Sequence, residues 1–195
     1  MKEIDYFASD QLISPKAGDL LISEPYLPDP NFERSVVLLC EHNKEGSFGL
    51  VLNQETENKL QDVISGITAV NAELFIGGPV QQNTLHFLHR APDLIDHIYK
   101  VKEGLYYGGD QKTLFALISE GSLRTEDFLF FVGYSGWSAG QLMEELKSKS
   151  WIVYRDIKPS EIFDIPSEQL WKHLLRKMGG KFKAISNYPA DPRMN

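Results

Sequence analysis

The feature that most constrains the fold is an apolar, β-branched run at residues 35–42, Ser-Val-Val-Leu-Leu-Cys-Glu-His. The next five residues, Asn43 to Ser47, are polar or glycine and have the chemistry of a turn. A second apolar run then extends from Phe48 to Asn53. Two such runs joined by a short polar turn predict a β-hairpin, and their apolar character predicts that it lies at the centre of a sheet.

Shorter segments with strand character follow on both sides of this hairpin, and Lys102-Glu103-Gly104 predicts a second hairpin turn. Apolar residues at helical spacing appear near Leu60, Leu114, Leu142 and Leu170. Helices and strands therefore interleave irregularly, which favours an α+β fold with a mixed, largely antiparallel sheet and flanking helices. The further predicted strands are 19–23, 74–77, 85–89, 97–101, 105–107, 128–133 and 151–154.

Composition excludes several classes of protein. The chain has 195 residues, 42% hydrophobic and 24% charged, which is typical of a globular domain rather than a disordered or fibrous chain. The net charge of −7 disfavours an extended phosphate-binding surface, and no helix-turn-helix pattern is present, so direct DNA binding is not expected. Positive charge concentrates only at residues 172–183, where it also suits the end of a helix.

The single cysteine, Cys40, cannot form an internal disulfide, which favours a reducing, cytoplasmic location. The sequence has no leader pattern and no apolar stretch long enough to span a membrane, so no membrane association is expected. No ligand spacing links the five histidines to one another or to Cys40, so neither a metal site nor a cofactor is predicted.

Four motifs occur in order along the chain. They are the segment 28–42 continued by Gly-Leu-Val-Leu-Asn at 49–53, then Gly-Gly-Pro at 77–79 with His89 ten residues on, then Gly-Tyr-Ser-Gly-Trp at 133–137, and finally Gly-Gln-Leu at 140–142 ahead of Trp151. Together they resemble the AlgH/YqgE family of bacterial proteins. The resemblance implies a compact α+β protein of the bacterial cytosol and a label of transcriptional regulator without an agreed reaction, ligand or DNA motif.

The resemblance covers residues 18–180, which we expect to form the domain. Residues 1–17 are then an N-terminal extension and 181–195 a C-terminal tail. Gln54 and Glu55 depart from the family pattern, which often has a basic residue and a proline at these positions.

Six motif residues are candidates for a binding groove: Arg34, His42, Asn53, Tyr134, Trp137 and Gln141. Tyr134 and Trp137 offer apolar contact area, and the Arg34 guanidinium can hold a carboxylate or phosphate. The sequence thus predicts a binding or regulatory module, without catalysis, for a small anionic or aromatic ligand or for a segment of a partner protein. The alternative for Arg34 is that it only ties a loop to a nearby carboxylate.

The alternative function is a hydrolase-like enzyme that uses Ser135 or Cys40 with a histidine. The segment 128–137 has the order of a nucleophile elbow, strand then turn then helix. The elbow, however, requires glycine two residues after the serine, where this chain has Trp137. Simple strand alternation places Cys40 and His42 on one face, as a thiol-imidazole pair requires.

Overall fold

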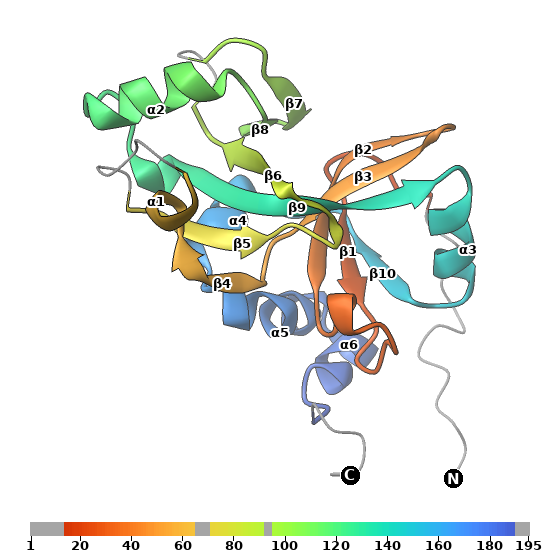
Figure 1. Ribbon diagram of the computed structural model, residues 1–195. Coiled ribbons are helices and arrows are strands. Elements are labelled where there is room, and N and C mark those ends of the chain that lie inside the picture. Colours follow the sequence, from red (N-terminus) through yellow and green to blue (C-terminus); the bar gives the residue numbers. More distant parts are fainter. Residues whose placement is uncertain (1–13, 65–70, 92–94, 190–195) are drawn as a thin grey trace, which may run out of the picture.

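The computed structural model describes residues 14–64, 71–91 and 95–189. Within these ranges ten strands form one mixed sheet, and helices cover both of its faces (Figure 1). The expected α+β class is confirmed. The strands are β1 Leu20–Ser23, β2 Val36–Asn43, β3 Gly46–Val51, β4 Glu55–Lys59, β5 Glu73–Ile76, β6 Val80–His89, β7 Tyr99–Lys102, β8 Leu105–Tyr107, β9 Phe128–Ser138 and β10 Trp151–Tyr154.

The helices are mostly short. They are η1 Pro30–Phe32, α1 Leu60–Val63, α2 Gln111–Ser119, η2 Thr125–Asp127, α3 Gln141–Lys147, α4 Pro159–Asp164, α5 Ser167–Met178 and α6 Gly180–Ile185. In the described ranges, no helix is long and apolar enough to cross a membrane.

The predicted central hairpin is β2–β3, and only Lys44 and Glu45 separate its strands. The strand order is β10-β1-β2-β3-β9-β6-β8-β7, with β5 also paired to β9 and β4 paired to β5. Every described pairing is antiparallel except β5 with β9. The sequence pattern missed β4, Glu-Thr-Glu-Asn-Lys, because this polar strand is formed by its pairing with β5 rather than by apolar alternation.

The long strand β9 organises the molecule by taking part in both halves of the sheet (Figure 1). Its first half pairs with β5 and β6, and its last residues pair with β3. Gly133 lies between the two halves at φ +67°, and a Cβ there would meet the carbonyl oxygens of Gly78 and Val80 at 2.7 and 2.8 Å. Glycine is therefore required at the point where β9 changes partners.

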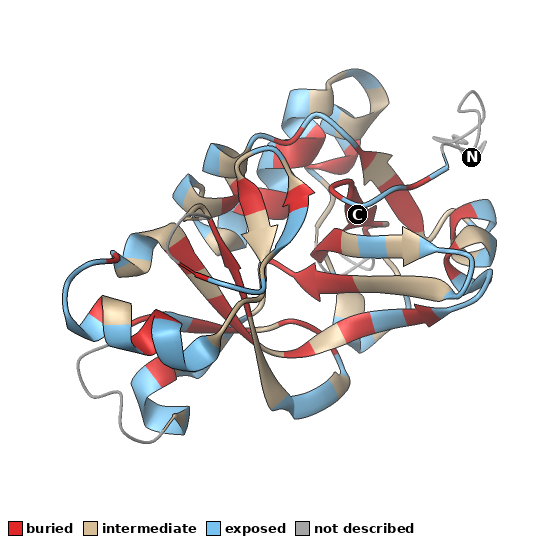
Figure 2. Ribbon diagram, turned by 90° about the horizontal axis from the view of Figure 1, so that it is seen from above, coloured by how far each residue is buried: buried red, intermediate tan, exposed pale blue. Residues whose placement is uncertain are grey.

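Three apolar clusters hold the layers together, and the strands at the centre of the sheet are buried (Figure 2). The largest cluster lies under α4, α5 and α6, the second under α1 and α2, and the third under α3. Ile185 of α6 is 1% exposed, so the packed part of the chain continues beyond residue 180. Most of the expected N-terminal extension, and the tail from residue 190, lie outside the described residues.

Candidate functional site

The six residues predicted to line one groove lie in separate places. Trp137 and Gln141 line one pocket, which the other four do not line. Arg34 contacts the C-terminal segment, Asn53 is hydrogen-bonded to the Arg34 carbonyl oxygen, and Tyr134 belongs to an aromatic cluster. The single concave surface expected for these six residues is not formed.

Arg34 contacts the chain itself. Its Nη2 donates to the carbonyl oxygens of Tyr188 and Pro189 at 2.6 and 2.5 Å, and its guanidinium lies 4.9 Å from the ring centroid of Trp171. Asn53 donates from Nδ2 to the Arg34 carbonyl oxygen at 2.9 Å and accepts from the Val36 amide at 2.8 Å. Arg34 therefore has the structural role of tying a loop, but its partners are backbone carbonyl oxygens of the C-terminal segment and not the expected carboxylate.

A β-bulge separates Cys40 from His42. The register of β2 against β3 shifts between Leu39 and Glu41, so Cys40 is an extra residue. His42 and Trp137 both lie opposite Ser47, and residues directly opposite each other share a face. Cys40 instead packs against the cluster under α4–α6, so the shared face that simple strand alternation predicts for Cys40 and His42 is not formed. The His42 Nδ1 lies 2.7 Å from the Ser47 Oγ.

Tyr134 belongs to an aromatic cluster on the face of the sheet that also carries Cys40. Its ring lies 5.1 Å from that of Phe48 and 5.7 Å from that of His86. His86 is held between the Thr84 and Tyr107 hydroxyls at 2.9 and 2.8 Å, and burial lowers its pKa. Burial also raises the pKa of Tyr107 to about 12, so both groups are neutral at pH 7 and act as packing side chains.

The hydrolase alternative lacks its geometry. Ser135 is completely buried, and its Oγ donates to the Gly77 carbonyl oxygen at 3.1 Å. Burial raises the pKa of the Cys40 thiol, which suppresses the thiolate that a nucleophile requires. In the described part of the chain, neither side chain is hydrogen-bonded to a histidine.

The pocket that Trp137 and Gln141 line has a volume of about 370 Å³, within the range of small-ligand sites. We call it the tryptophan pocket. Residues from all four sequence motifs meet there, although the motifs are far apart in the chain. Its lining residues are Leu27, Asp29, Phe32, Pro79, Gly136, Trp137, Gln141, Glu145, Ser150 and Trp151.

Glu145 is the central polar group of the tryptophan pocket. Its Oε2 accepts hydrogen bonds from the indole nitrogens of Trp137 and Trp151 at 2.8 and 2.7 Å. Its Oε1 accepts from Gln141 Nε2 at 3.0 Å. A carboxylate has about four acceptor positions, so one remains on Oε1. Among the described residues, no cation lies within ion-pair distance of Glu145.

The local sequence explains how these groups meet. Trp137 points toward α3 because alternate residues of β9 face that side, and Trp151 begins the next strand, β10. Gln141 and Glu145 are four residues apart on α3 and therefore lie on one helix face. Phe32 adds a third ring, with its centroid 6.3 Å from that of Trp137 and 5.3 Å from that of Trp151.

The chemistry of the tryptophan pocket suits a positive charge rather than a negative one. Its lining includes two carboxylates, Asp29 and Glu145, and no lysine, arginine or histidine. Its rings present electron-rich faces, which attract ammonium and guanidinium groups. The anionic ligand expected from the sequence depended on Arg34, which lies elsewhere.

Sequence reasoning did not select Glu145 as a site residue. The available signal was its spacing of four residues from Gln141, on a short helix between two tryptophans. A carboxylate at this spacing is common on exposed helix faces, so only the positions of the two indole nitrogens distinguish Glu145.

Comparison with known proteins agrees with the fold and with the motifs. A family model described as AlgH-like matches residues 20–183. A UPF0301 protein of Cytophaga hutchinsonii is 48% identical over 180 residues, covering 91% of this chain and 98% of that protein. A UPF0301 protein of Chlorobaculum parvum is 43% identical, covering 92% and 96%.

Two solved structures share the architecture. The solution structure of the AlgH protein from Pseudomonas aeruginosa aligns with a TM-score of 0.71 and 28% identity, covering 92% of this chain and 98% of that one. A crystal structure of a Corynebacterium diphtheriae protein aligns with a TM-score of 0.79 and 23% identity, covering 96% and 100%. The fold, the four motifs and these relatives agree, and the chain belongs to the AlgH-like family.

Proposed function

We propose that this protein is a binding module whose tryptophan pocket accepts an alkyl ammonium or guanidinium group. The observation that carries the proposal is the Glu145 carboxylate, which lines the pocket, accepts from two indole N–H groups and has no ion-pair partner in the described part of the chain. The neutral donors fix the carboxylate without cancelling its charge. A ligand cation supplies the missing counter-charge, and its alkyl stem contacts the rings.

A regulatory role, if the protein has one, then passes through the bound partner rather than through contacts with DNA bases. The acidic pocket and the net charge of −7 both oppose a phosphate backbone. A lysine or arginine side chain of a partner protein and a free amine present the same chemistry. The test therefore includes both sources.

Calorimetric titration with n-butylammonium and with a capped Gly-Lys-Gly peptide tests the proposal. Both contain the alkyl ammonium group, and a capped Gly-norleucine-Gly peptide is the uncharged control. We expect Glu145→Gln to weaken binding of the charged probes by at least about tenfold, because it removes a charge-assisted hydrogen bond. Glu144→Gln on the same helix is the matched control and leaves binding unchanged.

If only the peptide binds, the partner is a protein. If both probes bind with the same affinity, the pocket needs only the alkyl ammonium group, and a free amine can be its ligand. Equal affinity of the lysine and norleucine peptides, or equal binding to the folded Glu145→Gln protein, would contradict the proposal.

A further inference from the structure

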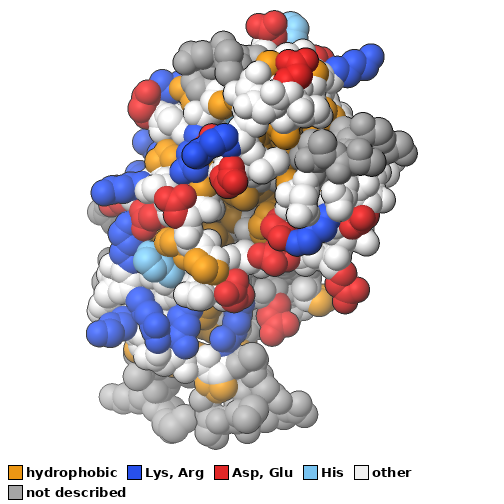
Figure 3. All heavy atoms as spheres, turned by 90° about the vertical axis from the view of Figure 1, so that its left-hand side faces the viewer, with side chains coloured by type: hydrophobic (Ala, Val, Ile, Leu, Met, Phe, Trp, Pro, Cys, Tyr) orange, Lys and Arg blue, Asp and Glu red, His pale blue; other side chains and the backbone are white. Residues whose placement is uncertain are grey.

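A second cavity lies on another face of the molecule. None of the aromatic residues from the four motifs lines it. It has a volume of about 450 Å³ and lies between the sheet formed by β4, β5 and β9 and the helices α4 and α5. We call it the acidic groove. Figure 3 shows a hollow on this face, with hydrophobic side chains at its bottom and acidic side chains on both sides.

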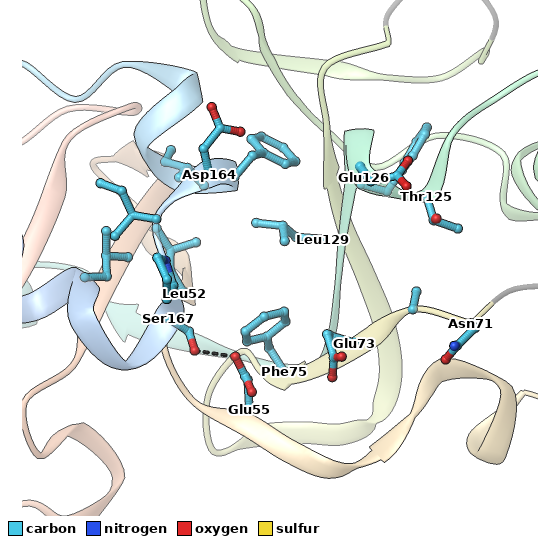
Figure 4. A pocket seen from close by; sticks show the side chains of 17 residues that line it. Leu52, Glu55, Asn71, Glu73, Phe75, Thr125, Glu126, Leu129, Asp164 and Ser167 are labelled. Atoms are coloured by element: carbon cyan, nitrogen blue, oxygen red, sulfur yellow. Dashed lines mark hydrogen bonds between the residues drawn. The ribbon is translucent and has the colours of Figure 1, made fainter.

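The floor of the acidic groove is apolar because the helices cover this part of the sheet incompletely. Phe75 of β5 is 6% exposed, whereas Leu129 of β9 and Phe163 of α4 are only half-buried. Leu129 and Phe75 lie in the middle of the cavity in Figure 4. An apolar side chain of about the size of leucine or phenylalanine can bury this surface.

The rim of the acidic groove is strongly acidic. Four carboxylates line it, and no lysine, arginine or histidine does. In Figure 4, Asp164 and Glu126 lie on one side of Leu129, and Glu55 and Glu73 lie on the other side. The negative charge thus flanks the apolar floor on both sides.

Part of this negative charge is already neutralised by the chain. Lys59 pairs with Glu73, and Arg90 pairs with Asp164 at 3.3 Å. Glu55 accepts a hydrogen bond from the Ser167 hydroxyl, which leaves its charge intact. In the described ranges neither the Glu55 nor the Glu126 carboxylate is in an ion pair, although Arg124 attracts Glu126 electrostatically. One carboxylate that can accept a further cation therefore lies on each side of the floor.

We infer that the acidic groove docks a segment of a partner protein in which an apolar side chain is flanked by lysine or arginine on both sides. The apolar side chain covers Phe75 and Leu129, and the flanking cations reach Glu55 and Glu126. Charge complementarity selects this occupant, because an acidic segment would be repelled by the two carboxylates and a purely apolar segment would offer them no cation. The inference is independent of the tryptophan pocket.

Fluorescence anisotropy with a labelled peptide tests this inference. The probe has a Leu-Phe pair with two lysines on each side, and its controls replace the lysines with glutamates or the Leu-Phe pair with two serines. We expect both control peptides to bind at least about fivefold more weakly than the probe. Affinity for the probe also falls as salt rises from 50 to 300 mM, because the flanking contacts are exposed ion pairs.

Protein variants separate the acidic groove from general acidity. The double variant Glu55→Gln, Glu126→Gln should lower the affinity for the probe about five- to tenfold. The effect is modest because each ion pair between a groove glutamate and a probe lysine is exposed to solvent. Glu45→Gln, at the exposed β2–β3 turn, removes the same kind of charge elsewhere and leaves affinity unchanged. The lysines of the probe also fit the tryptophan pocket, so the double variant is measured in the Glu145→Gln protein as well. An equal loss of affinity with and without Glu145→Gln separates this result from the test of the tryptophan pocket.

Three outcomes would overturn the inference. The first is equal binding of the serine-substituted peptide, which would reduce the groove to a cation-attracting surface. The second is unchanged affinity in the folded double variant. The third is concentration-dependent self-association that the double variant abolishes, which would make a second copy of this chain the occupant.

Discussion

The tryptophan pocket and the acidic groove are both acidic and aromatic, yet they are built differently. In the tryptophan pocket the central carboxylate is fixed by three hydrogen bonds from neighbouring side chains, and the two indoles are almost fully buried. In the acidic groove the Glu55 and Glu126 carboxylates are exposed, and the apolar floor is partly open. The first pocket is therefore part of what holds the fold together, whereas the second is a surface that packing left uncovered.

The largest expected effect comes from removing an indole of the tryptophan pocket. Trp137→Ala deletes a ring that is 5% exposed and packs against Phe32 and Trp151, and it should lower the free energy of unfolding by about 3 to 5 kcal/mol. Leu129→Ala in the groove floor should cost only about 1 to 2 kcal/mol, since that side chain is half-buried. Urea denaturation measures both, and equal losses would break the distinction between the two regions.

The next effect concerns the carboxylate. Glu145→Ala leaves the indole N–H groups of Trp137 and Trp151 without their acceptor and should destabilise the fold by about 2 kcal/mol. Glu144→Ala, the exposed neighbour, loses only an ion pair with Lys147, which is worth about 0.5 kcal/mol. Thermal unfolding of the two variants under the same conditions compares them, and identical midpoints would show that the indole bonds contribute nothing.

Arg34→Ala tests a residue outside both pockets. The variant loses two hydrogen bonds to the C-terminal segment and the contact with Trp171, which together are worth about 1 to 2 kcal/mol. Limited proteolysis should cut near Tyr188 faster in the variant than in the wild type. We expect ligand binding at the tryptophan pocket and at the acidic groove to stay unchanged in this variant. A loss of binding at either would support the ligand-binding role that the sequence predicts for Arg34.

A change of pH should affect the fold through histidines that lie outside both pockets. Burial lowers the pKa of His86 and of His89, so the unfolded chain binds these protons more readily than the folded one. Their contribution to stability is complete above about pH 6.5 and is lost as the pH falls below that value. Denaturant unfolding between pH 7.5 and 5.5 measures the slope, which His86→Gln should reduce; an unchanged slope would exclude His86.

The smallest effect on stability is expected for the charges of the acidic groove. Glu55→Gln and Glu126→Gln change exposed side chains without ion-pair partners in the described ranges, and each should alter the unfolding free energy by less than about 0.5 kcal/mol. The same two substitutions together should lower the affinity of the protein for the lysine-containing probe peptide. A large loss of stability would show that these carboxylates are structural, like Glu145.

The two regions also differ in how far the sequence predicts them. The β2–β3 hairpin and the apolar half of β9 follow from their apolar runs, and the motifs place Trp137 and Gln141 in the tryptophan pocket. The bulge at Cys40 and the contact of Arg34 with the C-terminal segment depend on pairing and packing between distant segments. The four motifs contribute only Leu52 to the lining of the acidic groove, because its floor and rim come from strands and helices that only the tertiary fold brings together.

A cation site at Glu145 is tested most sharply by the NMR signals of the three indole N–H groups during titration with n-butylammonium. Trp137 and Trp151 donate to Glu145, whereas Trp171 donates to the Ser23 carbonyl oxygen and is an internal reference. We expect saturable shifts of the Trp137 and Trp151 signals, a constant Trp171 signal, and no saturable shift in Glu145→Gln. Unsaturable shifts in the wild type, or equal shifts of all three indoles, would contradict a cation site at Glu145.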